Sequence, residues 1–159
     1  MAVEMTQGSM ERKVIVFRLK DEEYGVDVNQ VRSIERMQKI TRVPRTANFV
    51  KGVINLRGVV TPIIDLRERF GLAQEEHSEN TRIIIVAVDS MEVGLIVDAA
   101  NDVVDIQESS IEPPPAVVGG IQAAYLSGVA KLADRLLILL NLTKVLSAEE
   151  IQQLNHLEK

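Results

Sequence analysis

The sequence of 159 residues contains no cysteine. This absence excludes disulfides, thiolate nucleophiles and cysteine-based metal sites, and it fits a protein of the reducing cytoplasm. Aromatic residues make up only 3% of the chain, and the net charge of -5 comes without a dense cluster of lysine and arginine. We therefore expect no nucleic-acid partner, because phosphate attraction and base stacking both lack the side chains they need.

Long apolar runs are lacking too. None approaches the roughly 20 apolar residues of a membrane span, and Met1 to Arg12 holds acidic and polar side chains where a signal peptide needs an apolar core. We expect a cytoplasmic protein with a flexible N-terminus over residues 1–11 and no direct insertion into a membrane. The hydrophobic content of 46% still provides a sizeable core.

Residues of the kinds that catalyse reactions or bind metals are few. His77 lies in a polar linker and His156 near the end of the chain, and we expect both on the surface. Asp98, Asp102 and Asp105 are spaced carboxylates, but they lack the glycine and the final glutamate of a calcium loop. They alternate with valine and alanine, which favours the polar face of a strand and its turn. The sequence thus predicts no catalytic residue, no metal site and no cofactor. An enzyme that uses these three carboxylates is the rival hypothesis.

The sequence contains an internal repeat. Val14–Gly25 matches Ile83–Gly94, which lies 69 positions later. Gly52 recurs as Gly128, 76 positions later, so the second copy carries seven additional residues. We expect them in the proline-rich stretch 113–120. A doubled unit without a recurring catalytic residue favours a scaffold with two related surfaces.

Apolar runs between turn residues predict many short strands. The expected strands are Lys13–Leu19, Tyr24–Val28, Phe49–Leu56, Val59–Asp65, Thr81–Val88, Met91–Val97, Tyr125–Leu132 and Leu136–Leu142. Val31–Met37 fits either a helical turn or an irregular strand. Two similar sets of strands predict a pair of small barrels, because closure hides strand edges. The alternative is one larger sandwich.

Two segments carry helix signals. Asp65 and Glu68 have the spacing of a capping box, and Gly71 suits the end of a helix of one or two turns. A second helix is expected from Ser147 toward Leu157, near the end of the chain.

The role of Arg57 is left open by the pattern. This residue lies at the tip of the expected hairpin between Leu56 and Val59, with Lys51 nearby and Glu35 as a candidate partner. It is either an ordinary solvated turn residue or a recognition arginine at a protein interface, where its fork of donors favours specific pairing.

Six sequence blocks carry a resemblance to a known family. They are Glu22–Val28, Ile40–Pro44, Phe49–Gly58, Pro62–Arg67, Gly94–Asp98 and Tyr125–Gly128. In this order and spacing they resemble the CheW family of bacterial chemotaxis coupling proteins, from about Val14 to the end of the chain. The Asn-Leu-Arg-Gly block that ends at Gly58, with the Pro-Ile-Ile-Asp-Leu block that begins at Pro62, is specific.

The resemblance implies a mainly β fold, in which two five-stranded, Src-homology-like barrels pack around a shared apolar core, with short helices and a C-terminal helix. It implies a single domain over residues 12–159, which the repeat divides into barrels of about 12–72 and 81–146. The first strand can cross between the barrels, so the boundary between the copies in sequence need not be the boundary in space.

In function, the resemblance implies a non-catalytic adaptor without cofactors. Such an adaptor couples the cytoplasmic helical tips of chemoreceptors to the regulatory domain of the histidine kinase CheA, and it is recruited to membrane receptor arrays. The alternative is a similar adaptor in a kinase pathway other than chemotaxis.

Two sets of binding residues are implied by the same resemblance. The receptor-binding groove lies between the barrels, and its implied lining is Val31, Ile34, Ala100, Val103 and the polar Arg57. The implied kinase-binding residues are Ile40, Val43, Lys51 and Gly52. Many relatives have an acidic residue where this chain has Ser33, so Glu35 is the candidate acidic partner of Arg57 here.

Overall fold

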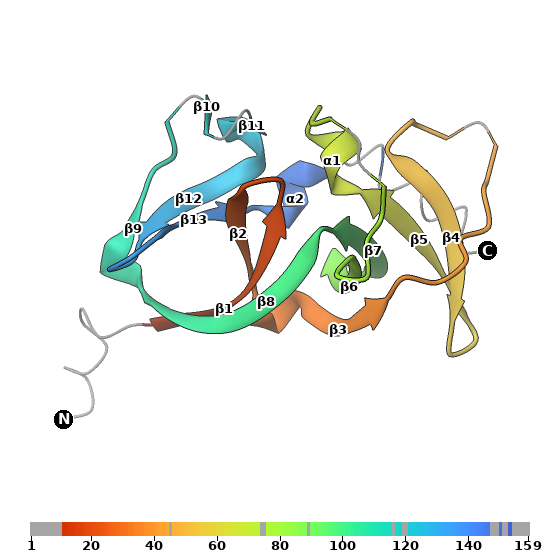
Figure 1. Cartoon of the computed structure of the whole chain (residues 1–159), viewed down its shortest axis with the longest axis horizontal. Helices are drawn as coiled ribbons and strands as arrows, with labels where there is room; N and C mark the ends of the chain where they lie inside the picture. Colours follow the sequence, from red (N-terminus) through yellow and green to blue (C-terminus); the bar gives the residue numbers. More distant parts are fainter. Residues whose placement is uncertain are drawn as a thin grey trace.

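Two curved β-sheets, one of six strands and one of five, make up most of the molecule (Figure 1). The computed structural model describes residues 11–44, 46–73, 76–88, 90–115, 117–118, 121–146, 150 and 153. A third, two-stranded sheet follows Pro113–Pro115 in the chain. The prediction of a mainly β fold is confirmed.

The elements follow one another along the chain as short strands with few helical turns. The strands are β1 (Glu11–Leu19), β2 (Glu22–Asp27), β3 (Val31–Arg36), β4 (Val50–Leu56), β5 (Val59–Asp65), β6 (Arg82–Val88), β7 (Met91–Val97), β8 (Ala99–Gln107), β9 (Ile111–Glu112), β10 (Val117–Val118), β11 (Ile121–Gln122), β12 (Leu126–Lys131) and β13 (Leu136–Leu140). The helices are α1 (Leu66–Arg69) and α2 (Leu142–Val145), and the 3-10 turns are η2 (Val28–Gln30), η3 (Glu108–Ser110) and η4 (Ala123–Tyr125).

Three segments show how the observed elements relate to the expected ones. The segment Val31–Met37 forms a strand, β3. The strand expected over Leu136–Leu142 ends at Leu140, because Asn141 caps α2 through the backbone N–H of Thr143. The helix expected from residue 147 lies almost wholly outside the described residues, as does the N-terminal segment 1–10.

The hairpins β1–β2 and β6–β7 are buried on both faces. In β6, Ile84 belongs to the core that the two sheets share, whereas Ile83 and Ile85 pack in a second cluster within the five-stranded sheet. In β1, Phe17 lies in the shared core and Val16 in a third cluster within the six-stranded sheet. This double burial explains why both strands read as continuous apolar runs.

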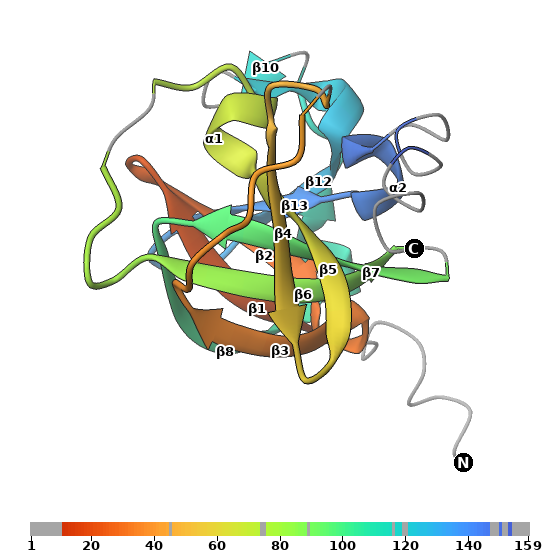
Figure 2. The ribbon, with the colours of Figure 1, turned by 90° about the vertical axis from the view of Figure 1, so that its right-hand side faces the viewer.

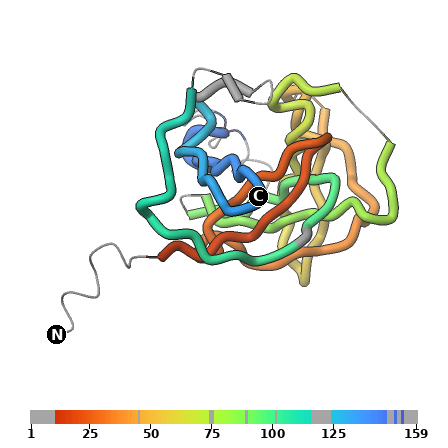
Figure 3. The backbone as a smooth tube through the Cα atoms, turned by 60° about the vertical axis from the view of Figure 1, so that its left-hand side comes forward, coloured from red at the N-terminus to blue at the C-terminus, as the bar shows by residue number. Residues whose placement is uncertain are grey.

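The two halves of the repeat exchange these hairpins. β1 pairs with β8 and β2 with β13, whereas β6 pairs with β3 and β7 with β5. Figure 3 shows the N-terminal hairpin alongside β8, which comes from the second half of the chain. The strand orders β8-β1-β2-β13-β12 and β3-β6-β7-β5-β4 are therefore equivalent. Each sheet contains strands of both copies.

The ends of each sheet meet through short contacts instead of a continuous ladder. In the six-stranded sheet, β8 continues through η3 into β9, whose Glu112 pairs with Val129 of β12. In the five-stranded sheet, an isolated bridge joins Thr41 to Val53 of β4. A Cβ atom at the neighbouring Gly52 would lie 2.0 Å from the carbonyl oxygen of Thr41. β9 is thus the counterpart of the segment around Thr41. One sheet has six strands, and not the expected five, because β9 forms a two-residue strand where Thr41 forms only an isolated bridge.

Candidate functional site

Four residues predicted to line the receptor-binding groove lie on the face between the two sheets. Val31 and Ile34 belong to β3, and Ala100 and Val103 belong to β8. Their partners across the neighbouring strands all belong to the shared core: Val86, Ile84, Phe17 and Ile15. Because residues paired across two strands point to the same face of a sheet, the four side chains stand where the shared core reaches the surface.

Ile34 and Val103 are the exposed members of this set. Their exposed fractions are 43% and 50%, whereas Val31 and Ala100 are half-buried against the shared core. Val31 and Ala100 are repeat mates, as are Ile34 and Val103, since each pair is separated by 69 positions. β3 and β8 hold equivalent places in the two sheets and run along the lower side of the molecule in Figure 1. The surface therefore repeats one apolar pattern twice.

Arg57 reaches Glu35, its predicted partner. The Nη2 group of Arg57 donates a hydrogen bond to Oε2 of Glu35 at 3.2 Å, and the Arg57 side chain is 70% exposed. Figure 2 looks onto the β4–β5 hairpin that Arg57 connects. Glu35 pairs with Ile83 across β3 and β6, so alternation places it on the opposite face of β3 from Ile34. The structure thus brings Arg57 and Glu35 together on the other face of β3 from the apolar residues.

Two further apolar residues are exposed beside Arg57. Val59 and Val60 begin β5 with exposed fractions of 53% and 36%. The sequence pattern identified them only as strand residues, since alternation does not show that a hairpin extends beyond the core. Their position next to Arg57 in a short hairpin was the feature of the sequence that could have indicated their exposure.

Three of the four predicted kinase-binding residues line one cavity. Ile40, Val43 and Lys51 contribute to its wall, and its volume is about 490 Å³. Lys51 Nζ donates a hydrogen bond to Oε1 of Glu68 at 2.6 Å, so a charged pair forms part of this wall. Gly52 differs from the other three because it is buried, and its close approach to Thr41 leaves no room for a side chain.

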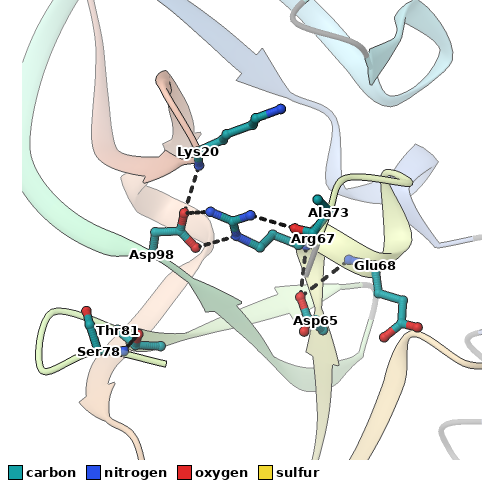
Figure 4. Close-up of polar contacts among 8 residues, drawn as sticks. All are labelled: Lys20, Asp65, Arg67, Glu68, Ala73, Ser78, Thr81 and Asp98. Atoms are coloured by element: carbon teal, nitrogen blue, oxygen red, sulfur yellow. Dashed lines mark hydrogen bonds and ion pairs between the residues drawn. The ribbon is translucent and has the colours of Figure 1, made fainter. Parts of the chain in front are cut away.

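A partly buried ion pair joins α1 to the residue that precedes β8. Asp65 caps α1 by accepting from the backbone N–H of Arg67 at 2.9 Å. The Arg67 side chain, 7% exposed, donates to both carboxylate oxygens of Asp98 (Figure 4). Asp98 also accepts from the backbone N–H of Lys20 at 2.7 Å, and Arg67 donates to the carbonyl oxygen of Ala73 at 2.6 Å. These bonds tie the β1–β2 turn, α1 and the β7–β8 junction together beside a cavity of about 290 Å³.

The electrostatics of this cluster keep Asp98 ionised. Burial alone raises the pKa of Asp98. Hydrogen bonds from Arg67 and Lys20 and the positive charge of Arg67 outweigh this effect, so that the pKa of Asp98 lies below its ordinary value. Burial, together with nearby negative charges, raises the pKa of Tyr24 above its ordinary value. Neither group is therefore matched to proton transfer near neutral pH.

The three carboxylates considered as catalytic groups each lie in an ion pair. Besides Asp98, which pairs with Arg67, Asp102 lies 3.5 Å from Arg135. Asp105 lies 3.1 Å from Lys13 on the neighbouring strand. These contacts connect elements of the fold, and they favour the interpretation of the carboxylates as a polar strand face over the enzymatic hypothesis.

Within the residues that the structure describes, no group of three or more His, Cys, Asp or Glu side chains could hold a metal ion. His77 is exposed, and His156 lies outside the described residues. The described segments include no helix with the length and apolar character needed to cross a membrane.

Comparison with known proteins places this architecture in a family. Residues 13–150 match the family model of the CheW-like domain. Chemotaxis protein CheW of Bacillus subtilis is 47% identical over 140 residues, which cover 88% of this chain and 90% of that protein. Chemotaxis protein CheW of Klebsiella aerogenes is 37% identical over 148 residues, which cover 93% of this chain and 89% of that protein.

A solved structure agrees with these sequence matches. The scaffolding protein TtCheW from Thermoanaerobacter tengcongensis superimposes with a TM-score of 0.82 at 41% sequence identity. The match covers 89% of this chain and 96% of that one.

Proposed function

Because the chain belongs to the CheW family of chemotaxis proteins, we propose that it couples the cytoplasmic helical tips of chemoreceptors to the regulatory domain of the histidine kinase CheA. The protein is a scaffold that acts through contacts and catalyses no reaction. Its partners recruit it to membrane receptor arrays. The similarity to chemotaxis proteins and to a scaffolding protein supports this assignment.

The observation that carries the receptor part of the proposal is the pair Ile34 and Val103. Both side chains are about half exposed, and both stand at equivalent positions above the shared core. Val31 and Ala100 widen this apolar strip toward the core. A receptor helix lays its apolar face along the strip, as amphipathic helices do in other apolar grooves.

Arg57 is the proposed polar recognition residue, and it lies with Glu35 on the other face of β3 from this strip. A guanidinium group has five N–H donors. Because the Arg57 side chain is 70% exposed while it bonds to Glu35, donors remain for a carboxylate or a carbonyl group of the receptor. Glu35, only 18% exposed, orients the arginine.

The kinase docks at the cavity lined by Ile40, Val43 and Lys51. A volume of about 490 Å³ is large enough to receive apolar side chains of a partner barrel. The Lys51–Glu68 pair supplies a polar rim, which favours one docking orientation over others.

A titration of the adaptor into receptor-bearing membranes and CheA tests this function. Phosphorylation of the kinase is expected to rise with adaptor concentration and to fall at large excess, because separate occupation of receptors and kinases removes the bridged complexes. Val103→Asp on the receptor surface and Val43→Glu on the kinase surface are expected to flatten the curve. Leu136→Asp is the matched control, since Leu136 is an exposed apolar residue outside both surfaces. A curve that rises to a plateau and stays there contradicts bridging.

A further inference from the structure

Three consecutive charged residues of α1 reach three different parts of the molecule. Arg67 binds Asp98 at the start of β8. Glu68 binds Lys51 of β4. Arg69 donates to the carbonyl oxygen of Val145 at 2.7 Å and to Glu150 at 2.9 Å. A helix of four residues thus connects both proposed binding surfaces and the C-terminal part of the chain.

The link to the receptor side is short and partly buried. Arg67 Nε donates to Oδ1 of Asp98 at 2.9 Å, and the Arg67 side chain is 7% exposed. Asp98 directly precedes β8, and its backbone N–H donates to the carbonyl oxygen of Arg18. Any movement of β8, which carries Ala100 and Val103, therefore acts on the Asp98 carboxylate and on the guanidinium that it holds.

The link to the kinase side begins one residue later. Glu68 accepts a hydrogen bond from Lys51 at 2.6 Å, and both residues line the cavity proposed for the kinase. Lys51 precedes Gly52, where the β4–β5 register shifts. Arg67 and Glu68 are neighbours in one turn of helix, so a rotation of α1 moves both ion pairs together.

The repeat shows that the fold does not require these ion pairs. α2 is the counterpart of α1, and Asn141 caps it through Thr143 N–H at 3.1 Å, as Asp65 caps α1. In α2, however, Thr143, Lys144 and Val145 stand at the positions of Arg67, Glu68 and Arg69, so the only charge is that of Lys144 and its sign is opposite to that of Glu68. The same capped turn therefore forms without a counterpart of Arg67 or of Arg69 and without an acidic side chain at the position of Glu68.

We propose that α1 couples the two binding surfaces, with Arg67 and Glu68 as positioning residues that transmit occupancy of the β8 surface to the cavity around Lys51. This inference rests on the proposed function. Coupling of this kind is a free energy shared between two sites, and it is reciprocal: the receptor changes the affinity for the kinase by the same factor as the kinase changes the affinity for the receptor. Binding at each site alone does not depend on it.

The coupling factor is measured from the affinity of the full-length protein for CheA with and without saturating receptor, in the form of the isolated cytoplasmic hairpin of a chemoreceptor. We expect a factor of about fivefold or more for the unaltered protein. Asp98→Asn is expected to bring the factor close to one while each separate affinity changes less than about twofold, since the amide keeps the shape of the carboxylate but not its charge, and Asp98 belongs to neither proposed binding surface. Glu68→Gln should also bring the factor close to one, but it should in addition lower the affinity for CheA alone, because Glu68 forms part of the wall of the kinase cavity.

Glu150→Gln is the matched control, because it removes an ion pair of Arg69 that lies off the path between the surfaces. This variant should keep the coupling factor of the unaltered protein. The inference is overturned if the coupling factor survives both Glu68→Gln and Asp98→Asn, if it falls equally in Glu150→Gln, or if it is already one in the unaltered protein. In each of these cases, binding to both partners leaves the proposed function standing. Failure of the unaltered protein to bind either partner overturns the proposed function and this inference with it.

Discussion

Arg57 Nη2 donates a hydrogen bond to Glu35 Oε2 at 3.2 Å, and the backbone of Arg57 is in the left-handed region, with φ at 52°. Gly58, the next residue, has φ at 86°, so both central residues of the hairpin turn have positive φ. Turns of this kind favour asparagine followed by glycine. For a residue with a Cβ the left-handed conformation costs about 1–2 kcal/mol, so the backbone alone does not explain arginine at this position.

Arg57→Asn is therefore expected to separate stability from recognition. Asparagine tolerates the left-handed region, and the exposed ion pair that is lost contributes less than about 1 kcal/mol, so the free energy of unfolding should stay the same or rise slightly. The affinity for a receptor fragment should fall about tenfold or more. Thermal unfolding and receptor binding are measured on the same preparation.

Lys131→Asn provides the comparison for this variant, because Lys131 also forms an exposed ion pair, with Glu112 at 3.2 Å. The melting temperature of this variant should change by no more than a few degrees, and its affinity for the receptor fragment should stay the same. Unchanged receptor binding in Arg57→Asn would remove Arg57 from the recognition surface.

We expect Gly52 to be needed first of all for the stability of the fold, whether or not a partner contacts it. Gly52 has φ at 143°, and a Cβ atom there would lie 2.0 Å from the carbonyl oxygen of Thr41. Gly52→Ala should therefore break the bridge between Thr41 and Val53 and lower the free energy of unfolding by about 3 kcal/mol. Chemical denaturation measures this change.

Gly71→Ala isolates the backbone contribution. Gly71 also has a positive φ, of 76°, but no heavy atom lies within 4 Å of the position that its Cβ would occupy. Its replacement should cost only about 1 kcal/mol. If the two variants lose equal stability, the contact with Thr41 does not explain Gly52, and a direct role in kinase binding becomes the better account.

Local signals in the sequence predicted much of the fold. Asp65 and Glu68 predicted α1, and the structure shows Asp65 accepting from the backbone N–H groups of Arg67 and Glu68. The repeat also contained a signal for α2 that the strand assignment missed, because Asn141 recurs at the position of Asp65. A cap is readable from sequence since its hydrogen bonds span only a few residues.

Contacts between distant segments could not be predicted in the same way. Both repeated hairpins have similar apolar patterns, so the residues themselves do not show which sheet each hairpin joins; only the family resemblance indicated that a strand can cross. The ion pair of Arg67 and Asp98 joins residues 31 positions apart. The sequence pattern indicates only a polar strand face for Asp98 and has no local signal for Arg67, because pairing at this range depends on how β7 and α1 pack.

Asp98 should make stability depend on pH. Its pKa in the folded protein lies below its ordinary value of about 3.9, so the folded state binds the proton less readily than the unfolded state. The resulting stabilisation is fully present above about pH 4 and is lost as the pH falls through the lower pKa of the folded state. Asp98→Asn should reduce the free energy of unfolding by about 2 kcal/mol at pH 7 and by much less at pH 2.

Denaturation curves at several pH values between 2 and 7 test this sign. Asp105→Asn is the control, since Asp105 and Lys13 are both more than half exposed and their pair should contribute little at any pH. A loss of stability in Asp98→Asn that is as large at pH 2 as at pH 7 would show that packing, and not the charge of Asp98, is responsible.

The exchange of hairpins predicts that the chain can be cut between its halves without coming apart. Residues 76–80 are exposed between the halves, and four strand pairings cross from one half to the other, namely β1 with β8, β2 with β13, β3 with β6 and β5 with β7. A protease site inserted after His77 should therefore give a cleaved protein that elutes as one species at the position of the uncleaved variant and separates into two fragments only in denaturant. The melting temperature should fall, because cleavage removes the tether that limits the entropy of the unfolded halves. Fragments that separate without denaturant and each keep their strand content would show that each half folds independently, which is incompatible with sheets built from both copies.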